Sequence, residues 1–232
     1  MQHFINFLVN THRAKVAFWL AASLAISFGL IFTRVTITGT GHFRFLVWNL
    51  LLAFIPYVIS TLLAYRTSRR KNLLIITASA SLWLLFFPNA PYILTDLFHL
   101  KQRSGIPYWF DLLMLLSAAW TGLMLGFVSL ADMQSVISNT FNKLTGWIFV
   151  VISMLLTGFG IYLGRYERWN SWDIVTNPTG LAKNILSYTL HPMDYPRVWA
   201  MTVAFAAFLI VGYFTIRQLG KIPLTATKND NA

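Results

Sequence analysis

The chain has 232 residues, of which 56% are apolar and only 11% are charged. An average soluble domain carries about 25% charged residues. The composition therefore excludes an ordinary soluble protein and indicates a lipid bilayer as solvent. The net charge of +11 does not indicate nucleic-acid binding, because the cations stand in short clusters between apolar runs, where they act as topology signals. The absence of cysteine excludes disulfides, thiolate metal sites and cysteine nucleophiles.

Six apolar runs are long enough to cross a membrane, since a helix needs about 20 residues to span a hydrocarbon core of about 30 Å. The first run follows Arg13 and Lys15 and is long for a signal-peptide core, so we expect an uncleaved transmembrane helix. The runs are apolar on every side, which disfavours membrane-spanning strands. We therefore predict an all-α, polytopic integral membrane protein with a single transmembrane domain over 1–232. The expected spans are 16–33, 45–65, 73–94, 108–130, 145–164 and 198–216.

The expected orientation depends on the densest basic cluster, Arg-Thr-Ser-Arg-Arg-Lys at 66–71. Placing this short loop in the cytoplasm puts both termini there as well. The cytoplasmic segments then hold ten Lys and Arg residues, including Lys228, and the other side holds eight, so the overall bias is weak and the dense loop decides. We expect a multi-pass protein of the cell membrane with both termini cytoplasmic. Loops 34–44, 95–107 and 165–197 then share the outer face.

The shared face collects most of the acidic and imidazole side chains, whichever side of the membrane it occupies. The opposite face keeps Asp132, Asp230, His3 and His12. Acids and imidazoles are therefore segregated by the topology itself. The members on the shared face are Asp96, Asp111, Glu167, Asp173, Asp194, His42, His99 and His191.

The third apolar run ends in Phe-Pro-Asn-Ala-Pro-Tyr at 87–92. Pro88 and Pro91 remove helical hydrogen bonds and disfavour helical geometry at the preceding residue, so we predict that this span is broken there. Asn89 is a candidate cap or a partner for the freed backbone groups. The alternative is a simple proline kink.

Beyond the prolines, Tyr92, Asp96 and His99 fall at i, i+4 and i+7, which places them on one helical face. An Asp-x-x-His pair can bind one metal ion, or the Asp can hold the His in one tautomer. The alternative is that Asp96 and His99 merely lie in the head-group region.

Two further segments of the shared face carry charge. Asp111 opens the fourth span and is either a site carboxylate or the partner of a loop arginine. Arg165 and Arg168 have guanidinium forks that bind carboxylate or phosphate, and Glu167 and Asp173 are acceptors close by. The alternative for this segment is a mesh of weak ion pairs within an aromatic belt.

A short amphipathic helix is expected before the last span. Within 179–190 the residues Leu181, Ile185, Leu186 and Leu190 recur at helical spacing, as in a helix lying in the membrane interface. His191 follows this helix. It is either a second imidazole ligand or a terminating residue at the negative end of the helix dipole.

The segments Pro-Asn-Ala-Pro-Tyr-x-x-Thr-Asp at 88–96 and Arg165 to Asp173 carry a family resemblance. The chain resembles the bacterial multi-pass membrane protein family catalogued as domain of unknown function 1361. The first motif is the specific part, and the likeness covers most of the chain from the second span onward. The resemblance implies a bacterial inner-membrane location and implies no activity.

Two functions stay open at this point. The first is a membrane-embedded, metal-dependent hydrolase or transferase acting on a lipid or envelope precursor at the outer face. The second is a non-catalytic small transporter or a scaffold for envelope machinery, with the broken span as a ligand site. Phosphate-binding glycine loops, His-Glu-x-x-His and the nucleophile elbow are absent from the sequence. The sequence leaves open the oligomeric state and whether the protein is an enzyme.

In the enzyme hypothesis the roles divide into three sets. The catalytic candidates are Asp96, His99, Asp111, Asp173 and His191. The candidate ligands of a divalent metal such as zinc are Asp96, His99 and His191. The residues expected to hold an anionic lipid or envelope precursor are Asn89, Tyr92, Arg165, Glu167 and Arg168. We expect Asp96, His99 and Asp111 to converge in one cavity with at least one of Glu167, Asp173 and His191, because an uncompensated charge near hydrocarbon costs about 3 kcal/mol.

Overall fold

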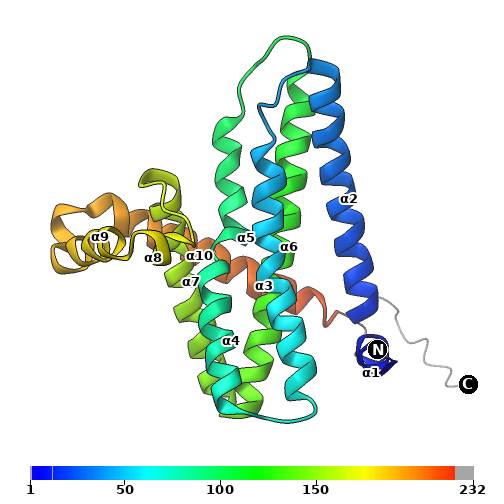
Figure 1. Ribbon diagram of the computed structural model, residues 1–232, viewed down its shortest axis with the longest axis vertical. Coiled ribbons are helices and arrows are strands. Elements are labelled where there is room, and N and C mark those ends of the chain that lie inside the picture. Colours follow the sequence, from blue (N-terminus) through cyan, green and yellow to red (C-terminus); the bar gives the residue numbers. More distant parts are fainter. Residues whose placement is uncertain (1, 12, 223–232) are drawn as a thin grey trace, which may run out of the picture.

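The computed structural model describes residues 2–11 and 13–222, so His12, Lys228 and Asp230 lie outside the described residues. All regular elements of the described part are helices (Figure 1). Six helical stretches are long and apolar enough to cross a membrane, which confirms the predicted multi-pass helical architecture. Five of them are the single helices α2 (Arg13–Thr38), α3 (Phe45–Thr67), α6 (Tyr108–Thr140), α7 (Lys143–Tyr166) and α10 (Pro196–Leu219).

The third spanning stretch is joined from three pieces: α4 (Leu73–Phe86), α5 (Asn89–Tyr92) and the 3-10 helix η1 (Ile93–His99). Turn residues Phe87 and Pro88 separate the first two pieces, and Figure 1 shows the ribbon bending there. Hydrogen bonding continues across the bend, since the Tyr92 amide donates to the Pro88 carbonyl at 3.0 Å. The bend is thus present, while a complete break at both prolines stays a prediction.

Short elements flank the spans. The helix α1 (Gln2–Asn10) precedes the first span, and α8 (Asp173–Thr176), α9 (Pro178–Leu190) and the 3-10 turn η2 (Pro192–Asp194) lie between the last two. The predicted helix before the last span is therefore confirmed as α9. The Asn177 side chain caps it by accepting from the Gly180 amide at 3.1 Å, and Pro178 occupies the first turn, where its missing N–H costs nothing.

Glycines at a spacing of four let α5 approach two neighbours closely. On α6, a Cβ added to Gly122 would lie 2.6 Å from the Ala90 carbonyl oxygen. On α7, Cβ atoms on Gly160 and Gly164 would lie 3.1 Å from Pro88 and from the Tyr92 ring. Small residues at this spacing are typical of close helix contacts in membranes. The glycines of α6 and α7 therefore fix the position of α5.

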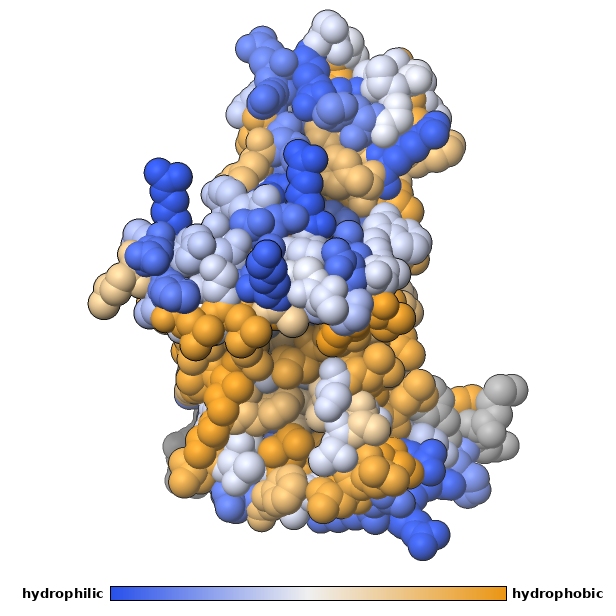
Figure 2. Space-filling view, turned by 60° about the vertical axis from the view of Figure 1, so that its left-hand side comes forward, coloured by the Kyte–Doolittle hydropathy of each residue, from blue (hydrophilic) through white to orange (hydrophobic). Residues whose placement is uncertain are grey.

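The outer surface of the spans is apolar. Large side chains such as Trp19 (70% exposed), Phe32 (70%) and Leu74 (77%) face outward, which in water would be a large unpaired patch. Figure 2 shows an apolar belt beneath a band of hydrophilic side chains at the level of α8 and α9. This surface is the one that a bilayer covers. Loops 39–44 and 100–107 meet at one end of the molecule, and the short connection after α6 lies at the other end (Figure 1).

Candidate functional site

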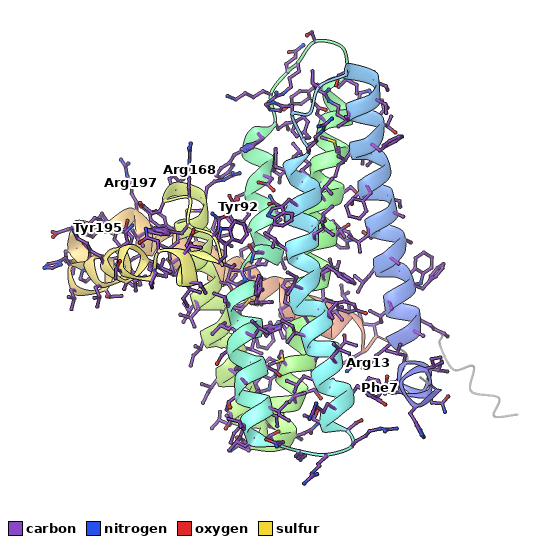
Figure 3. The ribbon with its side chains drawn as sticks, in the orientation of Figure 1. Phe7, Arg13, Tyr92, Arg168, Tyr195 and Arg197 are labelled. Atoms are coloured by element: carbon purple, nitrogen blue, oxygen red, sulfur yellow. The ribbon has the colours of Figure 1, made fainter. Side chains whose placement is uncertain are left out.

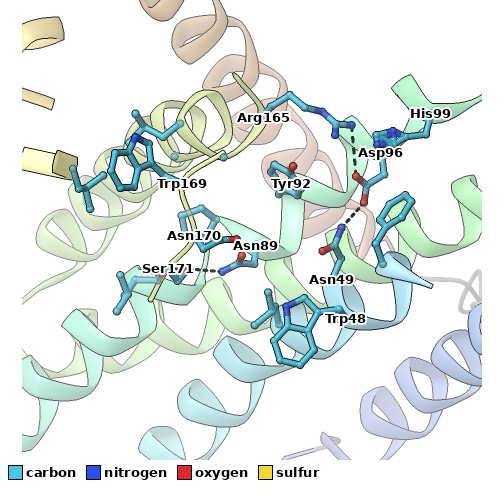
Figure 4. Close-up of a pocket in the computed structure, with 18 residues that line it drawn as sticks. Trp48, Asn49, Asn89, Tyr92, Asp96, His99, Arg165, Trp169, Asn170 and Ser171 are labelled. Atoms are coloured by element: carbon cyan, nitrogen blue, oxygen red, sulfur yellow. Dashed lines mark hydrogen bonds and ion pairs between the residues drawn. The ribbon is translucent and has the colours of Figure 1, made fainter. Parts of the chain in front are cut away.

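A cleft of about 350 Å³ lies between α3, the third span, α7 and the segment that follows α7 (Figure 4). Its lining includes the apolar side chains Leu52, Leu85, Leu163 and Leu181 and two polar groups, one around Asp96 and one formed by Asn89, Asn170 and Ser171. The close approach of α5 to the glycines of α7 brings the third span and α7 together along this wall. The cleft therefore combines apolar and polar lining residues.

Asp96 is the centre of the first polar group, with only 1% of its surface exposed. Its Oδ2 accepts a hydrogen bond from Asn49 Nδ2 at 2.7 Å, and its Oδ1 lies 3.5 Å from a terminal nitrogen of Arg165. Arg165 also donates to the Thr95 carbonyl and lies over the Tyr92 ring, with 5.5 Å from its guanidinium carbon to the ring centroid. Removing one partner of a buried pair of this kind costs about 3–5 kcal/mol.

The Asn89 side chain connects the bend of the third span to the segment after α7 through hydrogen bonds. Its Nδ2 donates to the Phe86 carbonyl and to Ser171 Oγ, both at 2.9 Å, and Ser171 Oγ donates to the Leu85 carbonyl at 2.9 Å. The two carbonyls lie in the last turn of α4, just before the bend. The expectation that Asn89 serves backbone groups freed near the prolines is confirmed.

Asp111 does not join the cleft, and here the expected convergence is corrected. Its Oδ1 accepts from Arg34 Nε at 2.6 Å and its Oδ2 from an Arg34 terminal nitrogen at 3.3 Å, with both residues buried. The pair satisfies both charges where α2 and α6 meet. Of the two readings left open by the sequence, the arginine partner is right, except that Arg34 belongs to α2 rather than to a loop.

Three other candidates also lie outside the cleft lining. Asp173 accepts from the Asn170 amide at 2.7 Å and from Thr176 Oγ1 at 2.8 Å, and these hydrogen bonds hold the pKa of its carboxyl below the usual value. Glu167 and His191 are exposed residues directly after α7 and α9. The prediction that at least one of these three residues shares a cavity with Asp96 is therefore wrong, because none of them lines the cleft.

A metal site is not assembled by these donors. A catalytic zinc site uses three protein ligands, and the cleft lining contains Asp96 and His99 but not His191. Within residues 2–11 and 13–222, no three His, Asp or Glu side chains come together as a metal site requires. We therefore propose no metal for this cleft.

Sequence reasoning missed Asn49, Trp48 and Ser171, which line the cleft. The sequence could have indicated Asn49, since it is the one amide or charged residue in the apolar run 45–65. Nothing in the sequence distinguishes Trp48 or Ser171, because aromatic residues in spans and serines in loops are common.

A family model described as a protein of unknown function (DUF1361) matches residues 48–211, which is more than half of the chain. The chain belongs to the DUF1361 family. The DUF1361 match runs from α3 into α10 and includes every residue that lines the cleft except Phe45. No curated protein and no solved structure matches the chain.

Proposed function

We propose that the protein binds a membrane amphiphile in the cleft, with the polar head group at Asp96 and Arg165 and the start of a tail against the leucines. The observation that carries this proposal is the buried Asp96 carboxylate, held by the half-buried Arg165 and Asn49, in a cleft that is also lined by four leucines. Ionisable residues inside a membrane protein are costly, and they commonly mark substrate or ion sites.

The size and position of the cleft support the same ligand class. Ligand sites have volumes of about 300–1,000 Å³, so a cleft of about 350 Å³ accommodates a head group and the first carbons of a tail. Trp48 lines the cleft, is 53% exposed, and contacts Trp172 with 6.2 Å between ring centroids. Tryptophans of this kind lie at the boundary between hydrocarbon and water.

The test is to fill the apolar part of the cleft. Leu181→Trp places an indole in the cleft, whereas Leu186→Trp adds the same group to an exposed position of the same helix, α9. The probe is phosphatidic acid carrying a photoreactive diazirine in its tail, in nanodiscs of phosphatidylcholine. We expect cross-links to cleft peptides of α3 and α7 in the wild type and in Leu186→Trp, and a loss of about tenfold in Leu181→Trp, as for about 1.4 kcal/mol of binding energy. Equal cross-linking of both variants would refute the proposal.

Catalysis on this ligand is a second candidate, favoured by the presence of Asp96, His99 and Tyr92 in the same cleft. A buried carboxylate can accept a proton from an attacking hydroxyl or water, and Arg165 can stabilise negative charge that develops on a head group. The reaction would be the hydrolysis or transfer that the sequence suggested, carried by side chains alone. A transporter or scaffold role stays a prediction.

A further inference from the structure

We propose that a basic hollow beside the cleft is a phosphate subsite, so that the amphiphile bound in the cleft is a lipid phosphate or diphosphate. This inference rests on the proposed function and names its substrate class. The basic hollow has a volume of about 730 Å³ and shares His99, Tyr92 and Arg165 with the cleft. Its basic and imidazole lining is His42, His99, Lys101, Arg103, Arg165 and Arg168.

Within the described chain, the lining of the basic hollow contains positive side chains but no negative ones. Among the described residues, those that line it include no Asp or Glu. Arg165 has Asp96 within 3.5 Å, but Lys101, Arg103 and Arg168 have no carboxylate within ion-pair distance. Phosphate oxygens are strong acceptors for guanidinium and ammonium groups. A ligand with at least two negative charges would complement this lining.

Two of the arginines also hold nitrogen atoms that need an acceptor. The Nε atoms of Arg103 and Arg165 are shielded from solvent and have no hydrogen-bond partner in the structure. Buried polar atoms are rarely left in this state, because an unmade hydrogen bond costs about 1–3 kcal/mol. A small shift of each guanidinium towards a bound anion would provide the missing acceptor.

The backbone at Arg168 is a separate observation. This residue has φ of 60°, the one positive φ of a non-glycine residue in the described chain. The conformation turns the chain after α7 so that the Trp169 amide donates to the Leu163 carbonyl at 3.1 Å. Glycine would adopt it without the cost of about 1–2 kcal/mol that another residue meets. Arg168 instead places a cation on the rim of the basic hollow, projecting away from α8 and α9 (Figure 3).

Two effects set the sign of the local potential. The C-terminal end of α7 carries about half a negative charge, which opposes an anion. Four basic side chains line the same space, and among the residues that the structure describes three of them have no carboxylate partner, since only Arg165 is paired, with Asp96. The pKa of the His42 imidazole is consistent with an excess of positive charge. Burial, Arg103 and Arg34 lower this pKa, and Asp111 on α6 raises it by less. The net field therefore favours an anion.

The experiment compares two lipids that differ only in the phosphate. Phosphatidic acid and diacylglycerol with the same tails are titrated into detergent-solubilised protein, and binding is measured by native mass spectrometry. The variant Lys101→Gln/Arg168→Gln removes two rim charges at exposed positions, and Lys183→Gln/Lys143→Gln removes two exposed charges elsewhere. Size-exclusion chromatography and thermal unfolding check that each variant folds.

We expect the rim variant to bind phosphatidic acid at least about tenfold more weakly and diacylglycerol as the wild type does, with the control variant unchanged. Equal losses in the rim and control variants, or an equal loss for both lipids, would overturn the subsite. Inorganic phosphate added as a competitor separates the two sources of the anion: displacement of phosphatidic acid at similar concentrations would show a site for free phosphate and overturn the lipid assignment.

Leu181→Trp separates failure of the subsite from failure of the cleft. If it weakens both lipids while the rim variant weakens neither, the cleft stands and the phosphate subsite is wrong. If the rim variant weakens phosphatidic acid while Leu181→Trp changes nothing, the basic hollow binds phosphate but the tail does not enter the cleft, so the combined proposal fails.

Discussion

Asp96 illustrates how a single carboxylate is kept inside a membrane protein. One oxygen accepts from the Asn49 amide and the other faces the Arg165 guanidinium, so its charge is compensated by two different spans. Arg165 in turn satisfies a backbone carbonyl of the third span. The three side chains connect α3, η1 and α7 and also line the cleft.

Replacing Asp96 with asparagine tests the catalytic candidate. The variant keeps the shape of the side chain but cannot accept a proton. We therefore expect its turnover of a phosphatidic acid with a fluorescent tail to fall by about 10²–10⁴-fold. Cross-linking of the diazirine lipid to the cleft should remain at the level of the wild type. Asp173→Asn is the matched control, because Asp173 only bonds within its own loop. Products are separated by chromatography and identified by mass spectrometry.

Two results would speak against catalysis by Asp96. Turnover by Asp96→Asn at the rate of the wild type would exclude this carboxylate as the proton acceptor. Conversion of no supplied lipid by the wild type would leave binding as the function of the cleft.

At the scale of elements, the position of the third span depends on how closely α6 and α7 approach it. The Ala90 carbonyl oxygen lies where a side chain at Gly122 would have to begin, and Pro88 and Tyr92 lie against the glycines of α7. Van der Waals contact of this kind replaces the hydrophobic effect, which gives helices little reason to associate inside lipid. The cleft inherits its geometry from these contacts.

Gly122→Ala and Gly29→Ala therefore have opposite expected effects. A Cβ at Gly122 would lie 2.6 Å from backbone, which must shift, so we expect a loss of about 1–3 kcal/mol. Gly29 of α2 has nothing within 4 Å of the same atom, and alanine there should stabilise the helix by about 0.5–1 kcal/mol. Thermal unfolding in detergent should show a lower midpoint for the first variant and an unchanged or higher one for the second; a Gly122→Ala protein as stable as the wild type would contradict the packing argument.

At the scale of the whole molecule, the six spans place successive loops at alternate ends. The basic hollow is lined by residues of loops 39–44 and 100–107 and by residues at and after the C-terminal end of α7. The charged residues at the opposite end include Arg13, paired with Asp132.

Reporter fusions determine which side of the membrane these loops occupy. A fusion at residue 70 and a fusion at residue 180 should report opposite sides, with 180 outside, because the basic loop at 66–71 favours the cytoplasm. A phosphatase and a fluorescent protein serve as paired reporters. The same side for both fusions would mean that the number of spans is wrong, and the reverse result would change only the orientation.

The sequence by itself determined the spans, because a helix that crosses lipid needs a long apolar run with no compensation from elsewhere. It also indicated the backbone role of Asn89, which follows from its place beside the prolines. Tyr92, Asp96 and His99 all line the cleft as expected, but the predicted α-helical stripe is wrong in its geometry, because residues 93–99 form a 3-10 helix with three residues per turn. The sequence did not show which residue pairs with each charged side chain. Asp111 was grouped with Asp96 although its charge is satisfied by Arg34, 77 residues earlier in the chain.

Only the tertiary structure decided which polar residues share a site. Asn49 reaches Asp96 from another span, and Lys101, Arg103 and Arg168 border one hollow although they come from two separate segments. The physical reason is that spacing along a helix fixes which residues share its face, whereas the rotation and depth of one span against another depend on close contacts such as Gly122 on Ala90 and Gly164 on Tyr92. Those contacts involve residues far apart in the chain, so they place the charges only when the bundle is complete.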